Sequence, residues 1–582
     1  MPKEPIAFDQ IMPIGRVTAV DTSRAYIQVE DHDKLKTVIV GHLTAIQGST
    51  GHQFLIAIVE RITRLPGETI ETKDSEDDTN LQQDALQDTI RVVLVGTYWT
   101  DRGGQGPTFK RGADACPQID QPCYLLEAQN LTFFMSTLAG DVEQKKAALE
   151  LGTYIIDREA RAFADGNRFF QRHAAIVGST GSGKSCAVAL LLEKAKQLAH
   201  PNLIVLDMHG EYANLCKGKE AYAQGLRLAG PGDLQKPGSE VLFLPYWLLN
   251  REEMLAMLLD RSDDNAPNQA TLFTSTVYQE KDKRLEKEKL FQVRATFTVD
   301  SPIPYDLEAV VAALQSADTA MVIGSSGREK QGEWHGKLTR FISRLEAKKA
   351  DRRYGFLFKP PASTQTYSWL AETFKNLMGS SGRTPGIKVI DFSEVPGDVL
   401  PIVAGVFARL VYDVQFWMKK EARTPICIIC DEAHLYLPVR EDSDATNKRA
   451  LEAFERIAKE GRKYGVALVV VSQRPSDVSR TILSQCNNFV ALRLTNEQDQ
   501  AAVKSVMPDS MAGLTDVLPL LDLGEALVLG DAVLLPSRVK LNLPKLKPLS
   551  LTRDFWTEWN SSSPNEADID AAIEALRRQS RS

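Results

Sequence analysis

The sequence predicts an α/β protein whose parallel-sheet core follows a small β-barrel and is interrupted by a bundle of helices. From about residue 173, apolar runs alternate with helical stretches, which is the pattern of a parallel sheet. Those runs are continuously apolar, as expected when helices cover both faces. Before about residue 130 the runs are short, rich in β-branched residues and separated by polar turns, which predicts the barrel.

The barrel segment contains four clear strand candidates. They are Ile14–Val20, Ala25–Glu30, Phe54–Val59 and Ile90–Val95. An acidic stretch with Asp74, Glu76, Asp77 and Asp78 lies between the last two. We interpret it as a solvated hairpin tip rather than a metal site, because carboxylates on a flexible loop have no fixed geometry.

The core and its interruption follow from the same change of pattern. The predicted core strands are Ala174–Val177, Leu203–Leu206, Ile387–Ile390, Ile426–Cys430, Ala467–Val471 and Phe489–Leu494. Helices are predicted at Arg251–Asp260, Thr276–Phe291, Asp306–Gln315 and Lys337–Lys348, which indicates a helical subdomain inserted into the core. The alternating charges of Lys281–Lys289 predict an exposed helix face.

After about residue 540 the chain is proline-spaced, and a terminal helix is predicted after Pro564 with Ile569, Ile573 and Leu576 on one face. This tail is too short for a core of its own, so we expect it to lie on its own domain or on a neighbouring subunit. The predicted organisation is a barrel at 1–135, core at 136–249, insertion at 250–380, core at 381–540 and tail at 541–582.

Composition excludes few functions. The 582 residues carry a net charge of −7, so the protein is not a basic coat for nucleic acid, although a local basic channel can sit in an acidic shell. We expect no apolar stretch near the ~18 residues that span a bilayer, no secretory leader, and a cytoplasmic location. Cys427 and Cys430 are three apart in a strand, so they point to opposite faces and are expected to be buried rather than metal-bound.

A glycine-rich segment, GSTGSGKS, joins the first core strand to a helix. It satisfies the G-x-x-x-x-G-K-[ST] pattern of a phosphate-binding loop. Its glycines let backbone N–H groups converge on phosphate oxygens at a helix N-terminus. Lys184 is predicted to reach the β- and γ-phosphates and Ser185 to bind Mg²⁺. The predicted nucleotide-binding residues are Gly178, Ser179, Thr180, Gly181, Ser182, Gly183, Lys184, Ser185 and Cys186.

An acidic pair, Asp431-Glu432, follows the apolar run Ile426–Cys430. Such a pair suits Mg²⁺-dependent hydrolysis of a γ-phosphate, with Asp431 at the metal and Glu432 polarising the attacking water. Alone it could equally be the acidic start of a helix. Together with the phosphate loop, it predicts an enzyme that hydrolyses ATP.

Two further motifs end neighbouring strands, and parallel strands bring their carboxyl ends to one edge of the sheet. Gln473, in VSQRP, is therefore predicted to reach the γ-phosphate or the attacking water. In DMHGEY at 207–212, we expect His209 to be structural. For Glu211, a nucleotide-binding role and a structural role are equally favoured.

A helix over Leu451–Lys463 is predicted, with Leu451, Phe454, Ile457 and Ala458 facing inward. It ends in EGRKY. Arg462 can be a simple complement to the helix dipole, or an arginine finger acting across a subunit interface.

These motifs in this order resemble the HerA/FtsK branch of P-loop motor ATPases, and specifically HerA. The matching elements are GSTGSGKS, DMHGEY, KVIDFS at 388–393, CDEAH at 430–434, and EGRKYG followed by VVVSQRPS at 460–476. The one departure is DMHGEY, where proline is more usual at the second position. The N-terminal barrel, the helical insertion and the tail resemble the family's HAS-barrel, helical bundle and C-terminal brace.

The resemblance implies a RecA-like core in a homohexameric ring that hydrolyses ATP with Mg²⁺ between subunits and pulls double-stranded DNA through its centre. Carried over by motif, Lys184, Ser185, Asp431, Glu432 and Gln473 serve the nucleotide, and Arg462 is the candidate that acts in trans. It also implies a partner, either a NurA-like nuclease in end processing or another effector in anti-phage defence.

Three alternatives compete with this interpretation. Asp431-Glu-Ala-His434 also spells the box of DEAH helicases, but too few residues follow for their second domain. A conjugative DNA pump is closer, although such proteins usually have membrane segments or partners. Finally, the ring can be an ATP-gated scaffold that assembles and regulates an effector with little translocation of its own.

Overall fold

The computed structural model describes most of the chain, and its described residues form two compact units. The described ranges are 6–8, 11–29, 32–36, 38–48, 50–65, 87–102, 106–144, 147–323, 328–379, 386–439, 445–505, 509–549, 555–561 and 565–579. Unit 1 comprises Met1–Lys194, Gln473–Ser476 and Cys486–Pro544. Unit 2 comprises Ala195–Ser472, Asp477–Gln485 and Lys545–Ser582. The acidic stretch at 74–78 lies outside the described residues.

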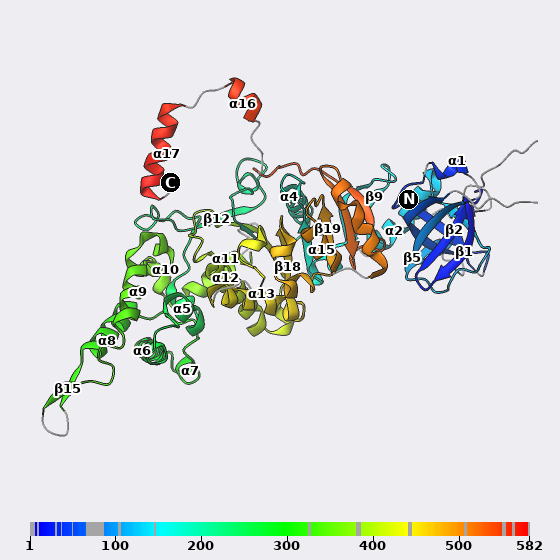
Figure 1. The fold of residues 1–582 in the computed structure, drawn as a ribbon. Helices are drawn as coiled ribbons and strands as arrows, with labels where there is room; N and C mark the ends of the chain where they lie inside the picture. The colour runs from blue at the N-terminus through cyan, green and yellow to red at the C-terminus, as the bar shows by residue number, and fades with distance from the viewer. Residues whose placement is uncertain are drawn as a thin grey trace, which may run out of the picture. The chain divides into compact units, whose positions relative to one another are not determined.

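Unit 1 begins with the β-barrel, as predicted. Its strands are β1 (Gly15–Asp21), β2 (Arg24–Val29), β3 (Leu43–Gln47), β4 (Gln53–Leu65), β5 (Gln87–Trp99), β6 (Thr108–Arg111) and β7 (Pro122–Leu125). They are ordered β2-β1-β7-β3-β4-β5-β6, and pairing of β2 with β5 closes the barrel (Figure 1). Alternate side chains such as Ile27, Leu55 and Val92 fill the interior.

A second sheet in unit 1 carries the phosphate-loop strand. Its order is β10 (Ala174–Val177), β19 (Asn488–Leu492), β20 (Glu525–Gly530), β21 (Ser537–Leu541), β8 (Ala148–Tyr154) and β9 (Arg161–Asp165). Only β10 and β19 pair in parallel, and the other neighbours are antiparallel. The sequence therefore predicted the parallel pair and missed the antiparallel extension, in which β21 pairs with β8 from a distant part of the chain.

Unit 2 holds a parallel sheet covered by long helices. Its order is β13 (Val241–Leu242), β12 (Gln224–Leu228), β16 (Ile387–Asp391), β11 (Leu203–Asp207), β17 (Ile426–Cys430) and β18 (Val466–Ser472). Residues of β11, β16 and β17 are almost all buried, which explains why they read as continuous apolar runs.

Helices α12 (Leu400–Trp417) and α13 (Ala445–Tyr464) pack together in unit 2. Contrary to expectation, α12 is an apolar helix of 18 residues, long enough by length and composition to cross a membrane. About two-thirds of this helix (67%) is buried inside the protein, as in a core helix.

The helical insertion is present in unit 2, with one correction to the predicted surface. Its elements are α5 (Arg251–Leu258), α6 (Ala266–Lys287), α7 (Phe291–Arg294), α8 (Leu307–Thr319), the hairpin of β14 (Met321–Ile323) and β15 (Glu329–Gln331), α9 (Thr339–Ala350), α10 (Gly355–Phe358) and α11 (Trp369–Leu377) (Figure 1). The prediction that Lys281–Lys289 forms an exposed face was wrong at Lys281, which is only 1% exposed. Its Nζ donates to the carbonyls of Val299 and Ser301. Sequence cannot anticipate a lysine that is anchored by distant backbone oxygens.

The tail forms two helices, α16 (Phe555–Ser561) and α17 (Glu566–Arg578). The predicted apolar face of Ile569, Ile573 and Leu576 is present on α17, and all three side chains are exposed. Trp556 and Trp559 on α16 are exposed as well.

Candidate nucleotide site

Three glycines of the phosphate loop are required by its backbone. The loop connects the buried strand β10 to α4 (Lys184–Ala195). Gly181 and Gly183 have φ values of +74° and +106°, which favour glycine. At Gly178 a Cβ would lie 2.5 Å from the Ser182 hydroxyl and 2.9 Å from Cβ of Leu492. The tight turn therefore depends on Gly178 and Gly183, which the motif fixes, and on Gly181, which it leaves open.

The polar side chains of the loop are held by neighbouring segments of unit 1. Lys184 is nearly buried, and its Nζ donates to the Ser179 carbonyl at 3.3 Å. The Thr180 hydroxyl donates to Oε1 of Gln473 at 2.6 Å. Gln473 follows β18 directly, so the structure brings this predicted γ-phosphate residue onto the phosphate loop. Ser185 and Cys186 lie in the first turn of α4, next to the helix N-terminus that favours anions.

The acidic pair follows a fully buried strand in unit 2. Asp431 is 3% exposed. Burial, together with the carboxylates of Glu432, Asp207 and Glu211, raises its pKa well above the usual range. Strands β11 and β17 are parallel, with Leu206 opposite Cys430, so Asp207 and Asp431 lie at the same edge of the sheet. A hard divalent cation such as Mg²⁺ beside Asp431 would favour the charged form of this carboxylate.

Glu432 adopts the left-handed backbone conformation, with φ 43° and ψ 47°. Its Oε2 lies 3.4 Å from Nδ1 of His434. The same nitrogen lies 3.4 Å from the hydroxyl of Ser472, the last residue of β18. The Tyr436 hydroxyl donates to the carbonyl of Asp431. The strand β17 therefore places both acidic residues at the carboxyl edge of the sheet.

The DMHGEY segment is organised by Asp207, which sequence reasoning did not single out. Its carboxylate accepts backbone N–H bonds from His209, Glu211 and Tyr212 at 3.3, 3.0 and 3.0 Å. Burial nevertheless raises the pKa of Asp207 to about 6, partly offset by those bonds. The available signal was an aspartate that ends a buried strand before a glycine turn. His209 is exposed, while Glu211 contributes its charge to the surroundings of Asp431.

Arg462 lies far from the acidic pair of its own unit. It is exposed in the last turn of α13, just before β18 begins. Asp431 follows Cys430, which pairs with Val470 in the fifth position of β18. The start of β18, next to Arg462, is therefore four residues away from the position level with Cys430. At ~3.3 Å per residue this corresponds to about 13 Å along the strand. The structure does not bring Arg462 to the carboxyl edge of this sheet.

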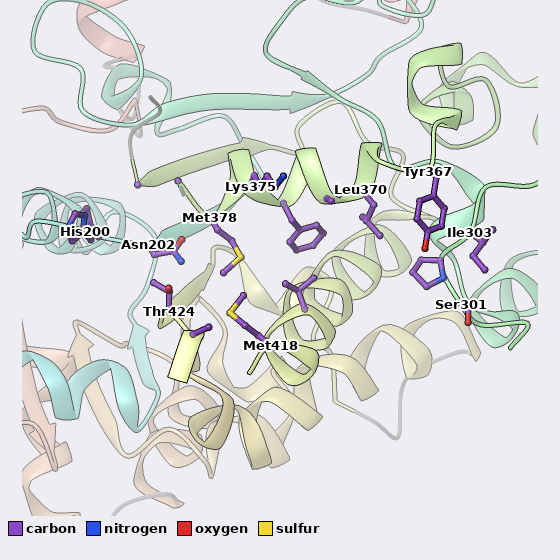
Figure 2. A pocket seen from close by; sticks show the side chains of 18 of the residues that line it. His200, Asn202, Ser301, Ile303, Tyr367, Leu370, Lys375, Met378, Met418 and Thr424 are labelled. Atoms are coloured by element: carbon purple, nitrogen blue, oxygen red, sulfur yellow. The ribbon is translucent and has the colours of Figure 1, made fainter. Parts of the chain in front are cut away.

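A large cavity in unit 2 lies at the opposite edge of the sheet from the acidic pair. It has a volume of about 1130 Å³ and is lined in part by Asn202 and Thr424, which precede β11 and β17. Figure 2 shows Met378 and Met418 pointing toward each other across it. Because Asn202 and Thr424 mark the amino ends of their strands, the cavity is distinct from the carboxyl edge that holds Asp431.

The chain matches two family models. One, described as "Helicase HerA, central domain", matches residues 149–411, and the other, "Helicase HerA-like C-terminal", matches residues 420–572. Together they span the phosphate loop, the acidic pair, Arg462 and Gln473.

Similar curated proteins carry the same name. The DNA double-strand break repair helicase HerA of Pyrococcus furiosus is 26% identical over 463 residues, which is 72% of this chain and 76% of that protein. The protein of that name from Saccharolobus solfataricus is 25% identical over 68% of this chain and 69% of its own. Among solved structures, VirB4 of Thermoanaerobacter pseudethanolicus is 16% identical and covers 70% of this chain and 98% of its own, with a TM-score of 0.43.

Proposed function

Because the chain belongs to the HerA helicase family, we propose that this ATPase is a hexameric motor that moves double-stranded DNA. The observation that carries the proposal is the separation of Arg462 from Asp431. An arginine that complements a γ-phosphate must lie beside it, and Arg462 is exposed at the other edge of its own sheet. It is therefore suited to act on the nucleotide of a neighbouring subunit.

Each proposed site residue has a distinct task. Backbone N–H groups of the loop and Lys184 bind the phosphates, while Thr180 holds Gln473 ready to contact the γ-phosphate. Ser185 and Asp431 would hold Mg²⁺, which when bound offsets the negative charge of the phosphates. Glu432 orients and polarises the attacking water. The raised pKa of Asp431 supports this assignment, because a nearby cation would favour the charged carboxylate.

The relatives' printed names, which mention DNA double-strand break repair, support duplex DNA as the substrate. We propose further that the ring works with a nuclease or another effector, in DNA end processing or in anti-phage defence. Identification of the protein that co-purifies with the native chain tests this part, and a native chain that co-purifies with no other protein would contradict it.

The central experiment measures ATP hydrolysis by the purified chain with and without duplex DNA, beside its mass in solution. A hexamer whose turnover rises with duplex DNA is expected. A monomer with DNA-independent turnover would contradict the ring motor.

A Glu432→Gln variant separates the motor from the scaffold alternative. As a motor, this variant binds ATP and DNA but neither hydrolyses ATP nor moves. We expect turnover to fall by roughly 10²–10⁴-fold, the usual contribution of a general base. If full effector activity persisted in the presence of the partner, the ring would instead be a scaffold.

A further inference from the structure

The orientation of Glu432 requires an explanation. Its backbone lies in the left-handed region, which a glutamate rarely adopts and which persists only where the surroundings impose it. Its side chain is 12% exposed. Within the described residues, the buried Oε2 has no hydrogen-bond partner. The imidazole of His434 lies beside this oxygen.

One nitrogen of His434 faces two oxygens at equal distances. Nδ1 is 3.4 Å from Glu432 Oε2 and 3.4 Å from the Ser472 hydroxyl. Both distances exceed the usual 2.7–3.2 Å of a protein hydrogen bond. In a neutral imidazole, Nδ1 is either a donor or an acceptor. In the tautomer with a proton on Nδ1 it can donate to Glu432, and in the other tautomer it accepts from Ser472.

Ser472 connects this choice to the phosphate loop through the chain itself. It is fully buried at the end of β18. The next residue, Gln473, accepts a hydrogen bond from Thr180 of the loop at 2.6 Å. A peptide bond therefore joins the residue that touches the histidine to the residue that is proposed to touch the γ-phosphate.

We infer that His434 is a positioning residue, which sets the orientation of Glu432 according to the position of Gln473. When the Ser472 hydroxyl donates to Nδ1, the ring has no Nδ1 proton for Glu432, and the carboxylate is available to a water molecule. When Nδ1–H donates to Glu432, that lone pair is engaged and the carboxylate is a poorer acceptor. This inference rests on the proposed ATPase function and gives it a link between phosphate sensing and hydrolysis.

The test replaces His434 in the full-length protein by asparagine or glutamine, whose side-chain amides imitate different ring nitrogens. Asparagine places its amide where Nδ1 lies, and glutamine places it where Nε2 lies. We expect His434→Ala to lower kcat for ATP by 10- to 100-fold, because the Glu432 carboxylate then loses the ring that holds its orientation, with the ATP dissociation constant within twofold of wild type. His434→Asn should recover most of kcat and His434→Gln should not. His52→Ala, on the exposed surface of the barrel, is the control.

A double-mutant cycle tests the relay. Because Ser472 acts through His434, Ser472→Ala should lower kcat in the wild-type background and have little further effect in His434→Ala. An unchanged kcat in His434→Ala, equal losses in the Asn and Gln variants, or additive losses in the cycle would overturn the inference. Absence of ATP hydrolysis in the wild-type protein, with or without duplex DNA, would instead contradict the proposed function.

Discussion

The helices of unit 2 and the carboxyl edge of its parallel sheet both bury charged side chains, but only the carboxyl edge places buried carboxylates beside one another. Arg409 on α12 makes two hydrogen bonds to Glu253 on α5, at 2.7 and 2.8 Å, and a third to the carbonyl of Leu248. Lys281 on α6 donates to two backbone carbonyls. Each buried cation has oxygen acceptors fixed around it.

At the carboxyl edge, carboxylates face other carboxylates. Burial and the charges of Glu432, Asp207 and Glu211 all raise the pKa of Asp431. Burial and Asp391 likewise raise the pKa of Asp207. A buried charge that is paired is costly to leave without its partner, whereas buried like charges lower stability and are typical of sites that receive a charged ligand. The contrast separates structural from functional burial within one unit.

The largest effect on stability is expected from breaking the compensated pair. Glu253→Gln removes the negative charge opposite Arg409 but keeps an amide that can still cap α5. Arg409 then keeps the longer pair to Asp413, at 3.3 Å, but loses its closest carboxylate, which should lower the free energy of unfolding by about 3–5 kcal/mol. Thermal unfolding of the variant measures the loss.

Glu252→Gln is the matched control for this prediction. Glu252 precedes Glu253 in α5, pairs with Arg449, and is 38% exposed in its side chain. An exposed pair contributes only about 0–1 kcal/mol. Equal losses in the two variants would show that burial does not distinguish these ion pairs.

The sequence predicted the parts of this contrast that are local. The glycine spacing of the phosphate loop, the apolar strand before Asp431 and the inward face of α13 are all encoded within a few residues. The parallel register of β11 and β17 then places Asp207 level with Asp431. The strands of the parallel sheet were predicted correctly because short, continuous apolar runs are typical of buried strands.

The remaining features depend on contacts between distant segments. Lys281 was expected to be exposed because its neighbours alternate in charge, yet carbonyls about twenty residues away hold it. The short barrel strands β3, β6 and β7 have too few residues for a clear alternation. The roles of Asp207 and His434 depend on which backbone or side-chain atoms the fold brings beside them. Such partners cannot be predicted from spacing alone.

A smaller, pH-dependent effect is expected at Lys281. Burial lowers its pKa from 10.5 to about 8. Between pH 8 and 10.5 the unfolded chain therefore binds more protons at this residue than the folded protein does, and its contribution to stability rises with pH. The rise amounts to about 3 kcal/mol at 1.36 kcal/mol per pKa unit. Lys281→Met should lack it.

The measurement is the difference in Tm between wild type and Lys281→Met at several pH values from 7 to 10.5, because other lysines and tyrosines titrate in both proteins. Lys283→Met provides the comparison, since Lys283 is 69% exposed in its side chain and pairs with Glu280. A difference between wild type and Lys281→Met that stays constant with pH would mean that the ammonium is fully compensated by its carbonyl partners.

The smallest effect, and the one with the opposite sign, is expected at Asp431. With nucleotide absent and EDTA present, Asp431→Asn removes a charge that three neighbouring carboxylates oppose. Its Tm should therefore rise, corresponding to a stabilisation on the order of 1 kcal/mol, while ATP hydrolysis is lost. Asp282→Asn on α6 should behave differently and lower Tm, because Asp282 pairs with Arg294 at 2.7 Å and the hydrogen bonds from Arg294 lower its pKa. Added Mg²⁺ and ATP should stabilise wild type more than Asp431→Asn, since the cation supplies the compensation that the protein lacks. A fall in Tm for Asp431→Asn in EDTA would mean that a protein group already balances this carboxylate, and the distinction between the two regions would fail.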